Sequence, residues 1–311
     1  MVDQAMLIAI LAATVTAGTP LLYAALGEII AERAGVLNLG IEGMMLVGAV
    51  TGFLITVNTA NPWLGVAGAL AAGGLLALIH AFLCVTLQAN QVVSGLALTL
   101  FGTGLSGYLG KSLIGVPAPK TFTFLALPGL YQIPYLGPVF FSQDILVYFS
   151  YLLVPLIWFF FYKTRQGLNL RAIGENPAAA DAVGVNVFFL RYIYVVIGGM
   201  FSGLAGAYLS LAYAPSWLEN MTAGRGWIAV ALVIFAGWDP LKAMAGAYLF
   251  GGVDALVYRM QAMGITMPSF FLKMLPYLFT IGVLIIATSQ TRKKRLGAPG
   301  ALSLAYDREE R

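Results

Sequence analysis

Residues Lys163 to Val187, KTRQGLNLRAIGENPAAADAVGVNV, form a polar stretch in a chain that is 60% hydrophobic and only 10% charged. The second half of this stretch carries both end signals of a short helix. Asn176 is suited to an N-cap, Pro177 to the first helical position and Gly184 to a left-handed stop. The alanines between them favour helix and leave a flat surface. The sequence therefore predicts a capped helix that is either a docking surface for a second protein or part of an ordinary solvated loop.

The composition of the rest of the chain requires a lipid bilayer as its solvent. A chain of 311 residues with a mean hydropathy of +0.86 lacks the charged residues that coat a water-soluble globule. The one cysteine, Cys84, excludes a disulfide framework and a multi-thiolate metal site. Because the opening residues Met-Val-Asp-Gln carry no basic leader, we expect the first apolar segment to remain as a membrane span.

A membrane span needs about 20 apolar residues, and several segments reach or approach that length. They lie near residues 5–26, 39–57, 63–87, 91–109, 144–162, 188–213 and 270–289. The stretch 226–258 is long for a single span, and Trp238-Asp239-Pro240 interrupts it with a polar turn. We therefore expect two short spans or a re-entrant hairpin in this stretch.

Basic residues predict the orientation of the spans. Lysines and arginines gather in the polar loop 163–187 and again at residues 292–295, so both segments should lie in the cytoplasm. An even number of crossings must then separate them. These arguments predict one transmembrane domain over residues 1–291 with about nine crossings, an N-terminus outside and a cytoplasmic tail over residues 292–311. The proline-rich loop at 110–143 then lies outside, where it either contacts a partner protein or packs on the bundle.

The chain offers no catalytic machinery. Gly110-Lys111-Ser112 resembles the end of a phosphate-binding loop, but that motif needs a glycine where Leu105 stands. His80 and Cys84 have a spacing that could bind a metal, yet no further histidine or cysteine exists to complete a site. The one histidine also lies in an apolar run, so no Ser-His-Asp constellation can be assigned. We expect no enzyme activity, no metal and no cofactor bound by this chain.

The segment 25–49 holds polar residues at helical spacing. Glu28 and Glu32 are four residues apart, as are Asn38 and Glu42, so each pair is expected to share a helix face. Ionisable groups near lipid are costly and usually face a cavity or a partner charge. The segment is therefore a candidate pathway or gate, or else a cytoplasmic loop with an ordinary ion pair between Arg33 and a glutamate.

Two further charged residues stand in apolar surroundings later in the chain. Arg225 either covers an external gate or anchors at the headgroups. Asp254, inside a predicted span, either lines a pathway or makes a hydrogen-bonded helix contact.

Three stretches together resemble the permease subunits of ATP-binding cassette importers, in the branch that serves simple sugars, nucleosides and branched-chain amino acids. Their order and spacing agree with that family, and the wording ERAGVLNLGIEGMM is most similar to nucleoside and simple-sugar permeases. The three are ALGEIIAERAGVLNLGIEGMMLVGA at 25–49, RAIGENPAAADAVGVNV at 171–187 and GRGWIAVALVIFAGWDPLKAMAGAYLFG at 224–251.

The resemblance implies an all-α, polytopic transmembrane helical bundle like that of a type II importer permease, in the plasma (inner) membrane. It implies a transport subunit without an ATPase site of its own, which carries a nucleoside or, alternatively, a simple sugar by ATP-driven alternating access. The implied partners are an ATPase subunit that uses ATP–Mg, a second homologous permease in a heterodimer and an extracytoplasmic substrate-binding protein. No nucleic acid is expected to bind.

The resemblance also implies roles for particular residues. ATPase coupling is expected at Asn176, Pro177, Ala179, Ala180, Asp181 and Gly184. The candidate pathway or gate residues, which rest on their own chemistry and spacing, are Glu28, Asn38, Glu42, Arg225 and Asp254. On this hypothesis, Ala180→Arg leaves membrane insertion intact and uncouples ATP hydrolysis from uptake.

The competing hypotheses are a self-sufficient secondary transporter or channel, and a membrane-embedded enzyme. A secondary transporter would use buried carboxylates such as Glu28, Glu42 and Asp254 for coupling, but it does not explain the capped helix in the polar loop. An enzyme lacks a convincing catalytic set.

Overall fold

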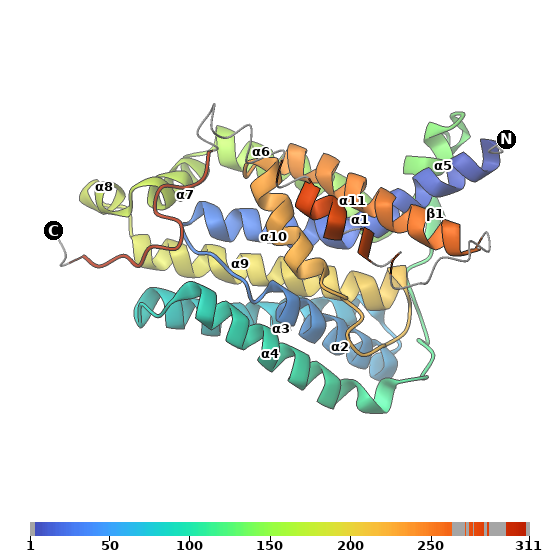
Figure 1. Cartoon of the computed structure of the whole chain (residues 1–311), viewed down its shortest axis with the longest axis horizontal. Coiled ribbons are helices and arrows are strands. Elements are labelled where there is room, and N and C mark those ends of the chain that lie inside the picture. The colour runs from blue at the N-terminus through green and yellow to red at the C-terminus, as the bar shows by residue number, and fades with distance from the viewer. Residues whose placement is uncertain are drawn as a thin grey trace.

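The computed structural model describes residues 4–262, 271, 274–275, 277–282, 285 and 297–308. Half of the span predicted at 270–289 and the basic residues 292–295 lie outside this part of the chain. Within it, long helices run roughly along one direction, with α7 and α8 at one end and α5 and β1 at the other (Figure 1). The N-terminal end of α1 lies at the α5 end, and the C-terminal segment lies at the α8 end (Figure 1).

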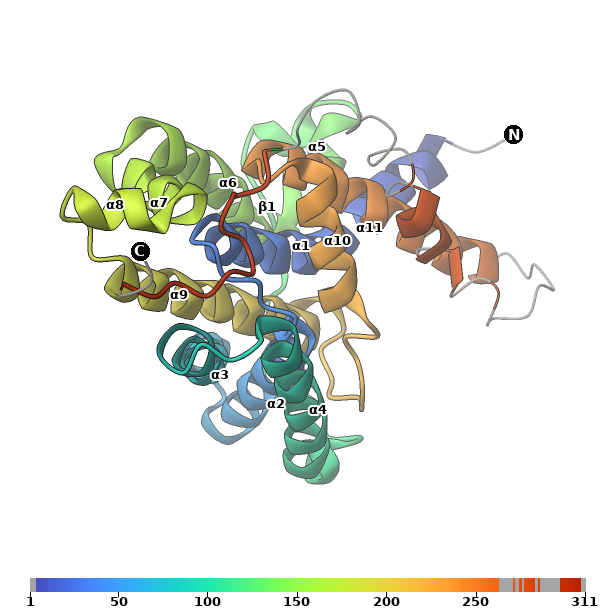
Figure 2. The ribbon, with the colours of Figure 1, turned by 60° about the vertical axis from the view of Figure 1, so that its left-hand side comes forward.

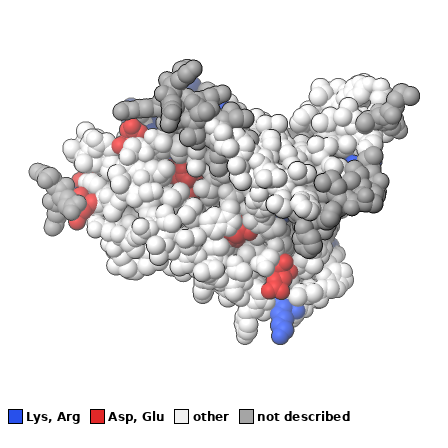
Figure 3. Space-filling view, viewed as in Figure 1, with Lys and Arg blue, Asp and Glu red and all other residues white. Residues whose placement is uncertain are grey.

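Six of the described helical segments are long and apolar enough to cross a membrane. They are α1 (Gln4–Arg33), α2 (Ile41–Thr59), α3 (Pro62–Ala81) with the π-helical η1 (Phe82–Thr86), α4 (Gln91–Gly110) with the 3-10 turn η2 (Lys111–Leu113), α6 (Ile145–Lys163), and α9 (Val187–Tyr208) with the π-helical η4 (Leu209–Tyr213). The predicted polytopic helical bundle is confirmed, and the figure of about nine crossings stays a prediction. In Figure 3 the visible described surface is almost entirely uncharged, as a lipid-facing surface requires.

The stretch 226–258 is interrupted where its sequence predicts. It forms the short helix α10 (Arg225–Ala236) and the longer α11 (Pro240–Ala262). Gly237 and Trp238, in the turn between them, have φ values of +61° and +57°, a left-handed geometry that ends a helix. Because α10 has only 12 residues, it is too short to cross a bilayer as a helix.

Helix α9 packs against α1, α2 and α3 near the middle of the bundle (Figure 2). Glycines permit the close approach. A Cβ atom added at Gly203 would lie 2.1 Å from the carbonyl oxygen of Ala69, and one added at Gly48 would lie 2.5 Å from that of Gly203. Small residues of this kind let membrane helices pack backbone to backbone where no hydrophobic driving force separates protein from lipid.

Replacing Gly203 by valine is therefore expected to destabilise the bundle by about 1–3 kcal/mol or more, because the added atoms overlap backbone that cannot move away. The measurement is the thermal midpoint of the detergent-solubilised protein. Gly104→Val is the matched control, since nothing lies within 4 Å of a Cβ atom added at Gly104. Equal midpoints for the two variants would contradict the close-packed α2–α3–α9 contact.

The connection between α4 and α6 forms a small cap at the α5 end. Beyond η2 it consists of β1 (Phe124–Ala126), η3 (Leu130–Gln132), α5 (Leu136–Phe140) and β2 (Ser142–Asp144), and the two strands pair antiparallel with Leu125 opposite Gln143. The Asp144 Oδ1 atom accepts from the backbone N–H groups of Leu146 and Val147, and so caps α6. Within the loop, the N–H of Phe122 donates to the carbonyl oxygen of Leu211 at 3.1 Å. The loop therefore packs on the bundle, as one of the two predictions for residues 110–143 states.

At the other end of the bundle, α7 (Arg165–Glu175) and α8 (Pro177–Ala182) follow α6. The chain then enters α9 after its N-cap Asn186, whose side chain accepts from the Phe189 N–H at 3.0 Å. Two capped helices in a loop between spans present a preformed surface rather than a flexible connection.

Candidate functional site

The predicted short helix is present as α8, with its local signals in the expected places. The Asn176 Oδ1 atom accepts a hydrogen bond from the backbone N–H of Ala179 at 3.0 Å, and Pro177 is the first helical residue. Gly184 has a φ of +88°, the left-handed geometry that closes a helix. The predicted capped helix is therefore confirmed.

One residue assigned to the docking surface of α8 faces the opposite way. Ala180 is only 3% exposed and belongs to the hydrophobic core, whereas Ala178, Ala179 and Ala182 are exposed. The prediction that Ala180 lies on the surface is wrong, because α8 packs this side against the bundle. An arginine at Ala180 would be forced into that packing, so Ala180→Arg would disrupt the fold and cannot test docking.

The exposed face of α8 continues beyond the helix. The side chain of Val183 is 79% exposed, and that of Leu168 on α7 is 57% exposed. Exposed apolar side chains next to a helix whose small side chains allow close approach make this a candidate protein contact surface. We call residues Ala178, Ala179, Ala182 and Val183 the α8 face.

Helix α7 holds α8 rigidly against the bundle. Leu170 and Ile173 are fully buried, and a Cβ atom added at Gly174 would lie 2.1 Å from the carbonyl oxygen of Arg33 at the end of α1. This close approach explains the glycine at position 174. Helix α7 thus connects α8 to the end of α1 through closely packed backbone.

Asp181, on the remaining side of α8, binds the C-terminal segment. Both of its carboxylate oxygens accept from the Arg308 guanidinium at 2.7 Å, and the Tyr306 hydroxyl donates to Oδ2 at 3.1 Å. The Asp181 carboxylate raises the pKa of Arg308 above its usual value. Asp181 is thus an intramolecular anchor, although the sequence assigned it to the surface that meets a partner.

Between α1 and α2, residues 34–40 form a non-helical linker inside the protein. Side chains from distant parts of the chain bind its backbone. The N–H of Leu37 donates to Gln91 Oε1 at 2.8 Å, and the carbonyl oxygen of Leu37 lies 3.0 Å from His80 Nε2. Two further contacts are Arg191 Nε to the Ala34 carbonyl at 3.1 Å and Thr99 Oγ1 to the Leu39 carbonyl at 2.9 Å.

These contacts explain how an unwound segment is accommodated among membrane helices. Non-helical backbone at membrane depth is tolerated only where protein groups satisfy it. His80, fully buried, bonds Ser94 at 2.9 Å with its other ring nitrogen, so its role here is to support the linker. No group of three or more potential metal-ligating side chains occurs among the described residues. The sequence showed that His80 is the one histidine of the chain, but nothing in it indicated that His80 would bind Leu37 and Ser94.

Glu28 and Glu32 share one face of α1, as their spacing predicts, and both are 1% exposed. Glu28 Oε1 accepts from the backbone N–H of Asn38 at 2.9 Å, while Glu32 accepts from the indole N–H of Trp238 in the α10–α11 turn. Arg33 donates to the carbonyl oxygen of Trp238 at 3.2 Å. The alternative of an Arg33–glutamate ion pair is not seen among the described residues.

Asn38 and Glu42 do not share a helix face, because α2 begins only at Ile41. The prediction that their spacing places them together on a helix is wrong. Asn38 lies in the linker, where its Oδ1 atom accepts from the N–H of Gly40 at 3.0 Å. Gly35, whose φ is +86°, allows the chain to change direction before α2 starts.

The side chain of Glu42 binds the N-terminal end of α10 through hydrogen bonds. Its Oε1 atom accepts from the Thr222 hydroxyl at 2.6 Å and from the N–H of Gly224 at 2.7 Å, and its Oε2 atom accepts from the N–H of Gly226 at 2.6 Å. A carboxylate at this position binds the free N–H groups and the positive end of the helix dipole. Two discontinuous elements, the start of α2 and the start of α10, therefore meet at one buried carboxylate.

Arg225, the first residue of α10, pairs with Asp254 of α11. The Arg225 Nη2 to Asp254 Oδ2 distance is 3.1 Å, and the side chains are 10% and 17% exposed. Arg225 also lies over the ring of Tyr213, 5.8 Å from its centroid. Its burial argues against an anchor at the lipid headgroups. Asp254 makes the helix contact that was one of its two predicted roles.

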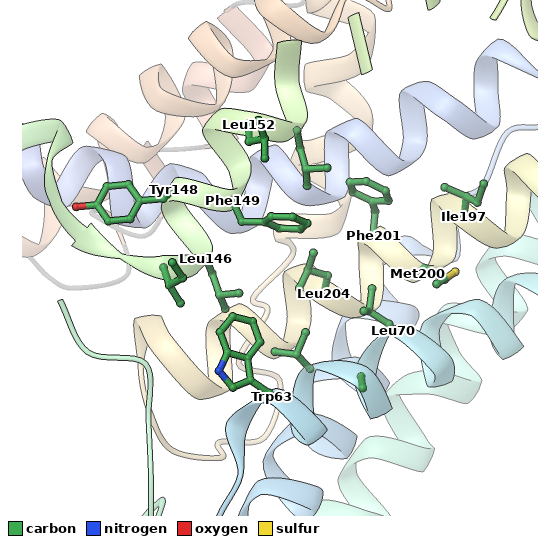
Figure 4. A pocket seen from close by; sticks show the side chains of 14 residues that line it. Trp63, Leu70, Leu146, Tyr148, Phe149, Leu152, Ile197, Met200, Phe201 and Leu204 are labelled. Atoms are coloured by element: carbon green, nitrogen blue, oxygen red, sulfur yellow. The ribbon is translucent and has the colours of Figure 1, made fainter. Parts of the chain in front are cut away.

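The five predicted gate residues thus gather around the linker and the start of α10, and Glu42 joins the two regions. They do not line the apolar cleft between α3, α6 and α9, which has a volume of about 740 Å³ (Figure 4). Trp63, Phe149 and Phe201 are among its lining residues. Because its walls offer almost no polar atoms, this cleft has no groups to orient a polar solute.

The family model described as branched-chain amino acid transport system / permease component matches residues 10–288 of the chain. The chain is 37% identical to the guanosine ABC transporter permease protein NupQ of Bacillus subtilis, over 88% of this chain and 89% of that protein. It is 36% identical to the nucleoside ABC transporter permease protein NupC of Lactococcus lactis, over 86% and 88% of the two chains.

A further relative carries another substrate in its name. TsgC13 of Haloferax volcanii, provisionally assigned as a glucose ABC transporter permease protein, is 47% identical over 96% of this chain and 98% of its own length. A second guanosine permease protein of Bacillus subtilis, NupP, is 25% identical over 76% of this chain. No solved structure matches the chain.

Proposed function

The chain belongs to the permease component family of branched-chain amino acid transport systems, and we propose on this premise that it forms the membrane pathway of an ATP-binding cassette importer for a nucleoside. The match over residues 10–288 carries the proposal. It is supported by the capped α8 helix, which offers a second polypeptide a rigid contact at one end of the bundle.

The nucleoside is proposed because two permeases named for guanosine and nucleoside transport align with nearly nine-tenths of this chain. A simple sugar is the second candidate, supported by the 47% identity to TsgC13. The two substrates share a ring with several hydroxyl groups, and only the nucleoside adds an aromatic base. A competition assay with the two substrates can therefore tell which of them the pathway carries.

The proposed partners follow from the same premise. An ATPase subunit that uses ATP–Mg would dock on the α8 face, and a substrate-binding protein would approach the opposite end of the bundle. NupP and NupQ come from one organism and both resemble this chain, which supports a second, homologous permease as the partner that completes the pathway.

The proposed orientation places α8 and the C-terminal segment in the cytoplasm and the N-terminus outside. The six long spans, together with α10, α11 and the span predicted at 270–289, would give the nine crossings. α10 needs the preceding non-helical residues to complete its crossing, as in transporters whose broken helices border the pathway.

In this mechanism the chain changes between two packings and hydrolyses nothing itself. ATP binding would draw the partner ATPases together, and α8 would move with the ATPase docked on it. Because α7 packs directly on the end of α1, that movement would reach the linker 34–40 and the beginning of α10. The hydrogen bonds of Glu28 would make the linker move with α1, and those of Glu42 would make the start of α10 move with α2.

A secondary transporter would need a buried carboxylate that takes up and releases a coupling ion. Asp254 is paired with Arg225, and Glu42 accepts from three donors. Both carboxylates thus have structural partners that ion coupling would have to break. This arrangement favours the ATP-driven importer over the secondary transporter.

The test is uptake into liposomes that contain this permease, its partner permease and the ATPase, with the binding protein added outside. We expect labelled guanosine to accumulate only when ATP is enclosed in the liposomes, on the side of the membrane where the ATPase is bound. Unlabelled guanosine should compete and glucose should not. Competition by glucose alone would replace the nucleoside with a sugar, and accumulation without ATP would favour the secondary transporter.

A further inference from the structure

Residues 297–308, here called the strap, lie across the α8 end of the bundle (Figure 1). The backbone N–H of Ala301 donates to the carbonyl oxygen of Gly174 at 2.8 Å, and the N–H of Gly300 donates to Glu175 Oε2 at 3.2 Å. The strap is therefore bonded to the end of α7 before it reaches α8.

The far end of the strap is fastened to α8 itself. Arg308 and Tyr306 place three donors on the carboxylate of Asp181. The Asp181 side chain is 16% exposed and that of Arg308 is 68% exposed. Exposed ion pairs contribute little to overall stability, but the two parallel bonds of this contact orient the Arg308 side chain against Asp181. We call Asp181, Tyr306 and Arg308 the clamp.

The same strap touches the membrane helices. Arg191 of α9 is 2% exposed and donates through Nη1 to the carbonyl oxygen of Leu304 at 3.4 Å, while its Nε donates to the carbonyl of Ala34 in the linker. The ring of Tyr306 lies 5.6 Å from that of Phe188. One buried arginine thus joins the strap to the linker, and the clamp joins the strap to α8.

We propose that Asp181 is a positioning residue for coupling: through Arg308 and Tyr306 it holds α8 on the strap, so that α8, Arg191 and the linker 34–40 move together. The proposal rests on the proposed function, because it concerns how movement of the ATPase reaches the pathway. It assigns Asp181 to the side of α8 that faces the strap, away from the docked partner.

A docking role and a positioning role for Asp181 lead to different results. A residue that contacts the ATPase would lose the ATPase when it is changed. If a residue that positions α8 is changed, the ATPase should stay bound but hydrolyse some ATP without moving substrate, since α8 would then move without the linker. The ATP consumed per substrate molecule moved separates the two roles.

The first experiment measures the clamp without any transport. Spin labels are attached at Ala182→Cys on α8 and Ala305→Cys on the strap, both at exposed positions, with the buried Cys84 replaced by serine. We expect a single narrow distance distribution in the otherwise unchanged protein. The double variant Arg308→Gln, Tyr306→Phe should broaden it, because it removes the two-bond guanidinium contact and the Tyr306 hydroxyl and keeps the ring that packs on Phe188. An unchanged distribution would overturn the clamp.

The second experiment measures coupling in the reconstituted importer. For the double variant we expect the ATPase to be retained in a pull-down and the ATP hydrolysed per guanosine moved to rise roughly twofold to fivefold. Arg308→Lys, which keeps the charge and loses the fork, should give an intermediate value. Ser303→Ala, at an exposed strap position, is the control and should match the wild type.

Loss of the ATPase from the double variant would overturn the positioning role in favour of docking. A broadened distance with an unchanged coupling ratio would also overturn it, because the clamp would then be structural only. A wild-type complex that shows no ATP-dependent uptake would overturn the proposed function and the coupling role together. The distance measurement would still decide whether the clamp exists, so the two failures are distinguishable.

Discussion

Ala179→Arg is expected to abolish uptake and to release the ATPase subunit. Ala179 is exposed on α8, so the arginine can extend into solvent and the isolated permease should keep its fold. In the complex the same side chain would occupy the space of the docked protein and bring an unpaired charge into the contact, which costs several kcal/mol. A loss of roughly 100-fold or more in ATPase affinity follows.

The measurement is a pull-down of the ATPase from mild detergent, followed by uptake into liposomes. Ala89→Arg is the matched control, because Ala89 is exposed in the connection between α3 and α4 and lies outside the α8 face. Normal ATPase recovery and normal uptake with Ala179→Arg would refute the α8 face as the docking surface. Ala180→Arg should instead lower expression and thermal stability, since it places the charge in the core.

Glu42→Ala should produce the second large effect, a loss of at least tenfold in uptake together with a lower thermal midpoint. The substitution leaves the Thr222 hydroxyl and the N–H groups of Gly224 and Gly226 without their acceptor. Each buried donor left unpaired costs about 1–3 kcal/mol. The beginning of α10 would have to move or admit water, and the contact between α2 and α10 would be lost.

Glu42→Gln refines this prediction. The amide keeps the size of the side chain but turns one acceptor into a donor that faces other donors, so we expect partial loss of uptake. Glu219→Gln serves as the control, because Glu219 is exposed. Wild-type uptake and an unchanged thermal midpoint for Glu42→Ala would show that Glu42 does not hold the start of α10.

Much of the fold could be predicted from composition and local signals. Apolar segments long enough to span a bilayer are visible directly in the sequence, because lipid selects for them regardless of what they pack against. The caps of α8 and the turn at Trp238-Asp239-Pro240 were also predictable, since each depends on the conformational preferences of a few adjacent residues.

The candidate site was predictable only in part. The polar residues of the segment 25–49 were identified, because charge is conspicuous among apolar neighbours. The partners of Glu28, Glu42 and Asp254 were not, and neither was the side on which Ala180 lies. Helical spacing says that two residues share a face, but it does not say which face packs against the bundle.

The sequence by itself therefore determined that this protein lies in a membrane, that its helices break near Trp238 and that a capped helix lies in the second half of the polar stretch 163–187. Only the tertiary structure decided that a buried linker joins α1 and α2, that Glu42 receives α10, and that the strap clamps α8. The reason is physical. Spans and caps are set by each segment and its solvent, whereas the linker depends on donors and acceptors such as Gln91 and Arg191, 54 and 157 residues from the groups they bind.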